Sequence, residues 1–88
     1  MIRLIEVKYI ITDELGIHAR PAGMLVKQCS IFSCDIKIGT PARMVDAKRI
    51  MGVMSLAMKH GEEVTMTFDG TDAVQAAEDL EAFLKENL

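Results

Sequence analysis

The sequence contains no tryptophan, one tyrosine and three phenylalanines, so its core has to be built mainly from aliphatic side chains and methionine. Hydrophobic residues still make up 50% of the chain, and seven of them are methionines. No apolar run approaches the roughly 20 residues that a membrane-spanning helix needs. An 88-residue chain of this composition is typical of one small globular domain, and we expect residues 1–88 to form a single domain.

The chain also lacks an excess of basic charge. Ten Lys and Arg residues are scattered among 13 Asp and Glu residues, which gives a net charge of -3. Binding to nucleic acid or to an anionic membrane needs a basic patch, so neither is an expected partner. The opening stretch MIRLIEVKYII carries no small-residue cleavage site of a signal peptide. We therefore expect a cytoplasmic protein that does not insert into membranes.

Cysteine and histidine are scarce, with two of each. Cys29 and Cys34 match neither a CxxC redox motif nor a zinc framework, and we expect reduced, partly buried thiols. His60, in the stretch KHG, belongs to no cluster with metal-ligand spacing, and we expect it to interact with the last carbonyls of a helix. The sequence therefore predicts neither a metal nor a cofactor.

Alternation of apolar and polar residues predicts four β-strands. The third of these, ARMVDA, follows a turn at Thr40-Pro41 and is expected to pair with the second as a hairpin. The residues predicted to face the core are Ile5, Val7, Tyr9 and Ile11 in the first strand, Cys34, Ile36 and Ile38 in the second, and Val64, Met66 and Phe68 in the last.

Apolar residues three and four positions apart predict three helices. The first runs from Ala19 to about Phe32, and the second covers KRIMGVMSLAM and is capped by Lys59-His60-Gly61. The third begins after Asp72, which can form a capping box with Gln75. Its predicted buried stripe is Ala73, Ala76, Ala77, Leu80, Phe83 and Leu84. The element order predicts an α+β fold, an antiparallel sheet with helices on one face.

The stretch LGIHARPAG places His18 where the first helix begins. The first amides of a helix have no partners within the helix and, together with the helix dipole, favour an anion. The same field favours a neutral imidazole, whose free nitrogen can act as a nucleophile. We therefore expect His18 to carry a phosphoryl group, with Arg20 reaching back to the phosphate oxygens. Gly16 and Pro21 suit the backbone of such a helix start.

Two stretches, LGIHARPA and IMGVMSL, and the spacing between them resemble the HPr family. This is the histidine-containing phosphocarrier family of the bacterial phosphoenolpyruvate phosphotransferase system. The resemblance covers essentially the entire chain. It implies an open-faced sandwich with four antiparallel strands and three helices. It also implies that enzyme I phosphorylates His18 on Nδ1 and that His18 then donates to the A component of an enzyme II. Arg20 would be the family's active-site arginine. We expect a phosphoryl-group carrier rather than a stand-alone enzyme, and a monomer, although the sequence itself leaves the oligomeric state open.

The family docks its partners on the first helix and the short second helix, next to the active histidine. The matching positions are Ala19, Arg20, Gly23, Met24 and Lys27 on the first helix, and Arg49, Ile50, Met51, Gly52 and Met54 around the second. Flexible methionines suit a surface that meets several partners. Met58 fits a core position equally well, and Met51 fits one less well.

Two positions depart from familiar members of the family. Many members have a regulatory serine before IMG, where this chain has Arg49, so we expect no serine-phosphorylated corepressor role. Leu15 resembles the nitrogen-related branch, which leaves the pathway open. Two rival functions also stay open: a regulatory binding module that transfers no phosphoryl group, and a small enzyme on a similar α+β scaffold.

Overall fold

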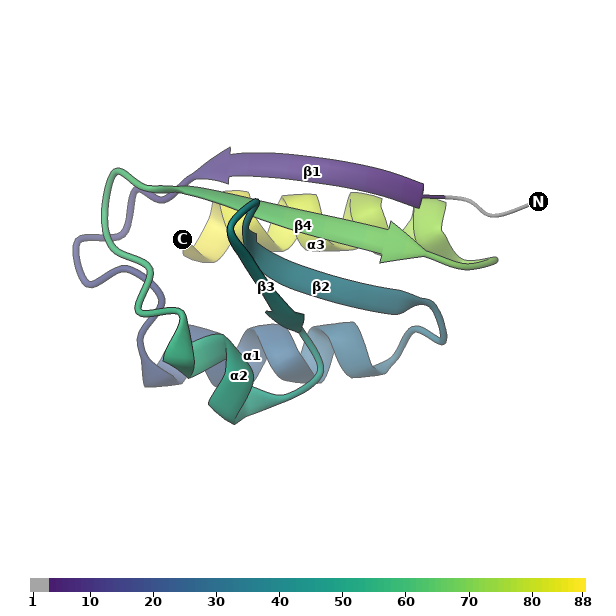
Figure 1. Cartoon of the computed structure of the whole chain (residues 1–88), viewed down its shortest axis with the longest axis horizontal. Helices are drawn as coiled ribbons and strands as arrows, with labels where there is room; N and C mark the ends of the chain where they lie inside the picture. Colours follow the sequence, from purple (N-terminus) through teal and green to yellow (C-terminus); the bar gives the residue numbers. More distant parts are fainter. Residues whose placement is uncertain (1–3) are drawn as a thin grey trace.

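The computed structural model of the chain describes residues 4–88, and its helices and strands follow the predicted order (Figure 1). The elements are β1 Leu4–Ile10, α1 Ala19–Ser30, β2 Asp35–Thr40, β3 Arg43–Asp46, α2 Ile50–Ser55, β4 Glu63–Asp69 and α3 Ala73–Asn87. The first helix ends at Ser30, two residues earlier than the sequence indicated.

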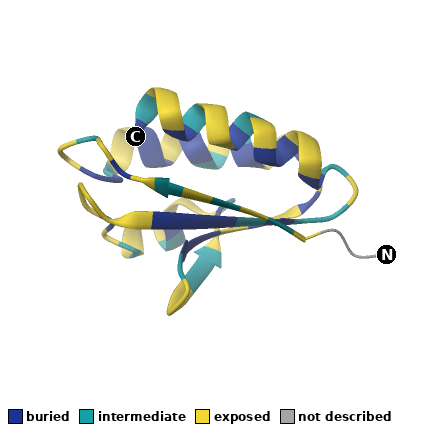
Figure 2. Cartoon of the chain, turned by 90° about the horizontal axis from the view of Figure 1, so that it is seen from above, coloured by how far each residue is buried: buried dark blue, intermediate teal, exposed yellow. Residues whose placement is uncertain are grey.

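The strands form one antiparallel sheet in the order β1-β4-β2-β3. The last strand, β4, lies between β1 and β2, because α2 carries the chain back past β2. In Figure 2, α3 lies along one side of the sheet with its buried stripe turned toward the strands. The predicted fold, an α+β sandwich with a four-stranded antiparallel sheet and three helices, is confirmed.

The core lies between the sheet and the helices and uses the strand faces predicted from the alternation. Val64, Met66 and Phe68 of β4 are fully buried, as expected for an inner strand, and Met66 and Phe68 are paired with Ile38 and Ile36 of β2. Each such side chain contributes roughly 1.5–3 kcal/mol of hydrophobic free energy when fully buried. Of the stripe predicted for α3, only Phe83 is not fully buried.

The end of α2 differs from the prediction. The helix stops at Ser55, and the chain then makes a tight turn in which the amide of Ala57 donates to the carbonyl of Met54, three residues earlier, at 3.2 Å. Ala57 then takes a left-handed conformation, with φ of 50°, and Met58 turns into the core with 4% exposure. The helical spacing of Met58 was misleading, because this residue is buried after the helix has ended.

The predicted cap of α2 is therefore wrong. Lys59, His60 and Gly61 lie in the exposed turn before β4, and His60 contacts no helix C-terminus. The amide of Gly61 donates to the carbonyl of Ile11 at 2.8 Å instead, which joins this turn to the end of β1.

The capping box predicted for α3 is also absent. The carboxylate of Asp72 accepts hydrogen bonds from the amides of Ser33 and Cys34, at 2.8 and 2.9 Å, and from the Ser33 hydroxyl at 3.1 Å. These bonds, the Ser33 amide first among them, lower the pKa of Asp72 to about 2. Gln75 bonds to Asp79. Asp72 thus ties the α1–β2 loop to the start of α3.

Cys29 and Cys34 are free thiols in the core beneath this loop. Burial raises the pKa of Cys29 to about 12 and that of Cys34 to about 11. Among residues 4–88 no three His, Cys, Asp or Glu side chains gather as a metal site would require. Nor does any helix in this range combine the length and apolar character needed to cross a bilayer.

Candidate functional site

His18 occupies the N-cap of α1, where the sequence analysis placed it. Its backbone is extended, with φ of -98° and ψ of -178°, and the helix begins at Ala19. The carbonyl of His18 accepts the amide of Ala22 at 3.0 Å, while the imidazole makes no capping hydrogen bond. The ring is thus attached to a fixed backbone and is free to react.

The first turn of α1 leaves two backbone donors open. Within residues 4–88, the amides of Ala19 and Arg20 have no hydrogen-bond partner, and Pro21 has no N–H. Amides in this position point out of the helix start, toward whatever precedes it. A phosphoryl group on His18 would meet these two donors together with the positive end of the dipole of a 12-residue helix.

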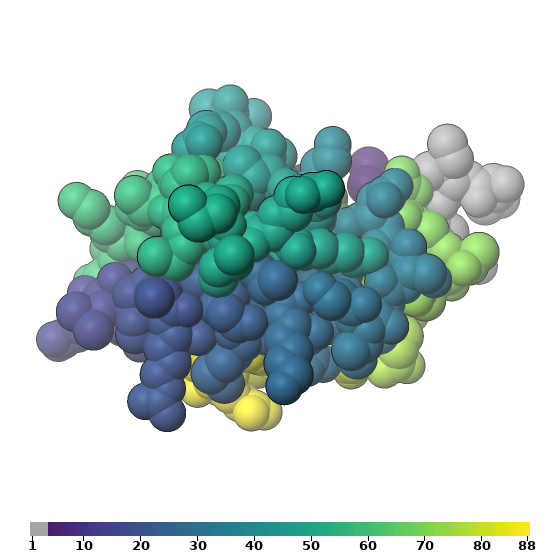
Figure 3. Space-filling view, turned by 90° about the horizontal axis from the view of Figure 1, so that it is seen from below, coloured from purple at the N-terminus to yellow at the C-terminus, as the bar shows by residue number. Residues whose placement is uncertain are grey.

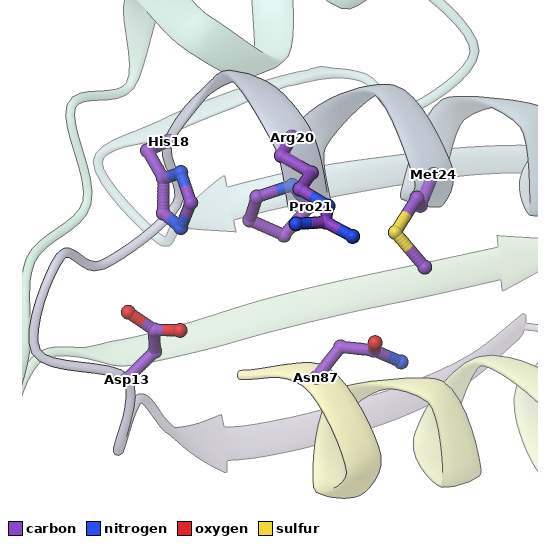
Figure 4. A pocket seen from close by; sticks show the side chains of 6 residues that line it. All are labelled: Asp13, His18, Arg20, Pro21, Met24 and Asn87. Atoms are coloured by element: carbon purple, nitrogen blue, oxygen red, sulfur yellow. The ribbon is translucent and has the colours of Figure 1, made fainter.

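His18 and Arg20 share a shallow surface pocket of about 310 Å³. Figure 4 shows their side chains descending from α1 toward Asp13, in the loop after β1, and Asn87, at the end of α3. Pro21 and Met24 complete the lining. His18 is half-buried and Arg20 is exposed, so a partner protein can reach the ring from solvent.

The loop before His18 is held by the segment that follows α2. The amide of Ile17 donates to the carbonyl of Met58 at 3.0 Å. Gly16 has φ of +67°, and a Cβ at this position would lie 2.2 Å from the same carbonyl oxygen. Only glycine fits here, because this backbone conformation disfavours other residues and the approach is too close for a side chain.

The other side of the pocket depends on the end of α3. The amides of Thr12 and Asp13 both donate to the carbonyl of Leu88. The carboxylate of Asp13 accepts the amide of Leu15 at 2.8 Å, which closes a turn before His18. Asp13 and Asn87 also line the pocket and were not predicted from the sequence. Asp13 could have been found from its short distance from His18 along the sequence. Asn87 reaches the pocket only because the end of α3 packs beside it.

The predicted docking residues lie together on one face of the molecule. Figure 3 shows α2, in green, lying beside α1, in blue. The large exposed apolar side chains of this face are Met24 of α1 and Ile50, Met51 and Met54 of α2, of which Met51 is the most exposed at 78%. Ala19, Gly23 and Lys27 are exposed beside them, and Gly52 is half-buried. Met58 does not belong to this surface, because it is a core residue.

A second hollow, of about 450 Å³, lies between α1 and the start of α2. It is lined by Val26 of α1 and by Lys48, Arg49, Ile50 and Met51, with Asp46 and Gly52. Arg49 is the N-cap of α2, and its side chain is 81% exposed, with Nε 3.6 Å from a carboxylate oxygen of Asp46. This contact offsets part of the unfavourable placement of a cation at a helix start.

Comparison with known proteins identifies the family. The family model described as "PTS HPr component phosphorylation site" matches residues 5–86. The phosphocarrier protein HPr of Mycoplasma capricolum is 49% identical over 67 residues, which cover 76% of this chain and 75% of that protein.

Two solved structures are also similar to this chain. The histidine-containing phosphocarrier protein of a Mycoplasma has a TM-score of 0.89 and 40% identity, with 93% of each chain covered. A phosphocarrier protein HPr from Bacillus anthracis has a TM-score of 0.85 and 37% identity, with 92% of this chain and 96% of that chain covered. The chain therefore belongs to the HPr family, the phosphocarrier proteins of the phosphotransferase system.

Proposed function

We propose that this protein accepts a phosphoryl group from enzyme I on Nδ1 of His18 and passes it to the A component of an enzyme II. The observation that carries the proposal is the position of His18, an accessible imidazole at a helix start beside two open amides. In the cytoplasm, the compartment that we propose for it, such a protein would act as a diffusing carrier. The pathway that it serves, whether sugar uptake or nitrogen-related regulation, is set by its enzyme II.

The transfer needs a nucleophile and a binding place for charge. A bond forms between phosphorus and Nδ1 as the bond from phosphorus to the donor group of enzyme I breaks, and the PO₃ group moves without water. In such reactions the protein contributes positioning and charge stabilisation. The open amides of Ala19 and Arg20 can donate hydrogen bonds to the phosphoryl oxygens and so stabilise their negative charge.

Arg20 supplies the positive side chain of the pocket. Its guanidinium shares the hollow with the imidazole of His18, and its planar fork can pair with two phosphoryl oxygens at once. Asp13 lines the opposite side and holds the loop through its bond to Leu15. A carboxylate facing the same hollow opposes a bound phosphate, which favours release to the next acceptor.

We propose that enzyme I and the enzyme II component dock in turn on the face formed by α1 and α2. Support comes from the exposed methionines there, since flexible thioether side chains adapt to different partners. Arg49 replaces the hydroxyl that a serine kinase would need, so this chain is not controlled by phosphorylation at that position.

The test is labelling with phosphoenolpyruvate and enzyme I. The wild-type chain acquires an acid-labile phosphate, and His18→Ala acquires none while keeping the circular dichroism of the folded protein. The matched control is His60→Ala, since His60 is exposed, lies outside the pocket and is the second of the two histidines. It keeps the label. Label in His18→Ala, or loss of label in His60→Ala, would contradict the proposal.

The regulatory alternative makes the opposite prediction. A binding module without phosphoryl transfer would bind its regulator with equal affinity as the wild type and as His18→Ala, and it would take no label. We favour the carrier because the chain keeps His18, Arg20 and Pro21 together at the helix start.

A further inference from the structure

The side chain of Arg43, at the start of β3, forms two hydrogen bonds to Ser55 in the last turn of α2. Its Nη1 donates to the carbonyl of Ser55 at 3.0 Å, and its Nη2 donates to the Ser55 hydroxyl at 2.9 Å. That hydroxyl in turn donates to the carbonyl of Gly52 at 2.6 Å. One guanidinium thus satisfies acceptors at the negative end of the helix, where a cation is favoured.

The helix needs this external support. It has six residues, and a helix that short does not persist on its own in water. Of its side chains only Val53 is buried, so few core contacts hold it. At its start, Arg49 makes no side-chain capping bond, but its amide donates to the carbonyl of Asp46 at 3.2 Å, and Nζ of Lys48 donates to the carbonyl of Phe32 at 2.7 Å. A cationic side chain from outside α2 is therefore bonded to its C-terminal end, while Lys48 is anchored to the α1–β2 loop two residues before its start.

The contacts of Arg43 bear on the docking face and not on the loop that carries His18. Met51 and Met54, on the exposed side of α2, move with the helix. Ser55 also lies three residues before Met58, whose carbonyl receives the amide of Ile17, the residue next to His18. The loop that carries His18 is held there by this backbone bond, which does not involve Arg43.

We propose that Arg43 is a positioning residue, which holds α2 and its exposed methionines in the orientation that the phosphoryl-exchanging partner proteins bind. The inference rests on the proposed function for the identity of these partners. Arg43 lies outside the predicted docking set and touches neither His18 nor the pocket around it. Its effect should appear in binding of the partner and not in the chemical step.

The test compares three variants with the wild type. Arg43→Gln removes the charged fork, and Arg43→Lys keeps the charge but can reach only one acceptor. The control is Lys8→Gln, which removes the same charge from β1, the opposite edge strand, where the exposed Lys8 side chain forms an ion pair with Glu6 at 3.9 Å. Two quantities are measured, the hydrogen exchange of the α2 amides and the KM and kcat for each variant as acceptor from enzyme I.

For Arg43→Gln, we expect exchange at Val53 and Met54 to become about tenfold faster. KM rises about three- to tenfold while kcat stays within about twofold, which is the pattern of lost ground-state binding. Arg43→Lys falls between this variant and the wild type, and Lys8→Gln matches the wild type in both measurements.

Three results would overturn the inference. If hydrogen exchange of the α2 amides is unchanged in Arg43→Gln, the stability of α2 does not depend on the Arg43–Ser55 hydrogen bonds. A raised KM with unchanged exchange makes Arg43 a direct partner contact. A fall in kcat alone assigns it to the chemistry. If the wild type itself takes no label, the proposed function has failed, and the exchange measurement alone then decides whether Arg43 fixes α2.

Discussion

The closest approach in the site gives the sharpest prediction, which is that Gly16→Ala is strongly destabilising. The residue has φ of +67°, and an added Cβ would lie 2.2 Å from the carbonyl oxygen of Met58 and 2.8 Å from Cα of Lys59. A left-handed alanine costs roughly 1–2 kcal/mol, and forcing a side chain into a packed place costs roughly 1–3 kcal/mol more. Together these give about 2–5 kcal/mol, and a loss of about 3 kcal/mol would lower Tm by roughly 12–24 °C for a domain of this size.

A second glycine separates the two causes. Gly61 also has a positive φ, of +87°, but no heavy atom lies within 4 Å of the place that its Cβ would occupy. Gly61→Ala therefore suffers only the conformational strain, about 1–2 kcal/mol. The excess destabilisation of Gly16→Ala over Gly61→Ala measures the contact with the Met58 carbonyl. Urea unfolding of both variants, with equal slopes, gives this difference directly.

The Gly16 variant should also lose transfer activity while it is still folded. The clash is relieved if the carbonyl of Met58 or the backbone of residue 16 moves, and either movement disturbs the bond of Ile17 to Met58 next to His18. Well below the Tm, we expect kcat/KM with enzyme I to fall about tenfold in Gly16→Ala and to stay unchanged in Gly61→Ala. Equal stability losses in the two variants, with equal activities, would refute the reasoning.

Two further predictions follow from the pKa shifts. The pKa of Asp72 falls from 3.8 to about 2 on folding, so its contribution to stability is complete above the unfolded value and is lost as the pH falls toward about 2. The urea midpoint should therefore drop less steeply in Asp72→Asn than in the wild type between about pH 5 and pH 2. With pKa values of about 12 and 11, Cys29 and Cys34 are protonated thiols at neutral pH, and maleimide should label them only when the fold opens. Rapid labelling of the native protein at about pH 7.5 would be incompatible with these buried thiols.

The strands were predictable because one physical signal dominates each of them. Alternation along β4 has a single explanation, namely a strand with Val64, Met66 and Phe68 turned inward, and burial of these residues follows from it. The long helices α1 and α3 have stripes wide enough to be equally clear.

The short helix and the loops could not be read in the same way. Met58 lies at helical spacing from Met54, but its burial depends on a left-handed turn at Ala57 and on a bond to Ile17, which is far away in sequence. Asp72 has the sequence signature of a helix cap, yet two amides of the α1–β2 loop compete successfully for its carboxylate. In both cases a tertiary contact overrides a local preference.

The residues of the candidate site show the same difference between local sequence signals and tertiary contacts. His18 and Arg20 were predictable, since a helix start, an imidazole and a guanidinium are all encoded within a few residues. Asp13 and Asn87 reach the same pocket because the carbonyl of Leu88 holds the loop after β1 against the end of α3. The catalytic candidates are thus local features of the sequence, and the residues that shape their surroundings are not.

The solvent exposure of the pocket affects how easily a carrier can both accept and release a phosphoryl group. A carrier must release its phosphoryl group as readily as it accepts it, so the phosphorylated state cannot be strongly favoured. Arg20 is exposed, and a solvent-exposed ion pair contributes only about 0–1 kcal/mol. With Asp13 facing the same hollow, the groups that we propose to bind phosphate lie in a nearly neutral setting in the unphosphorylated chain. A deeply buried pocket with several cations would bind the phosphoryl group more tightly and so slow its release to the next protein.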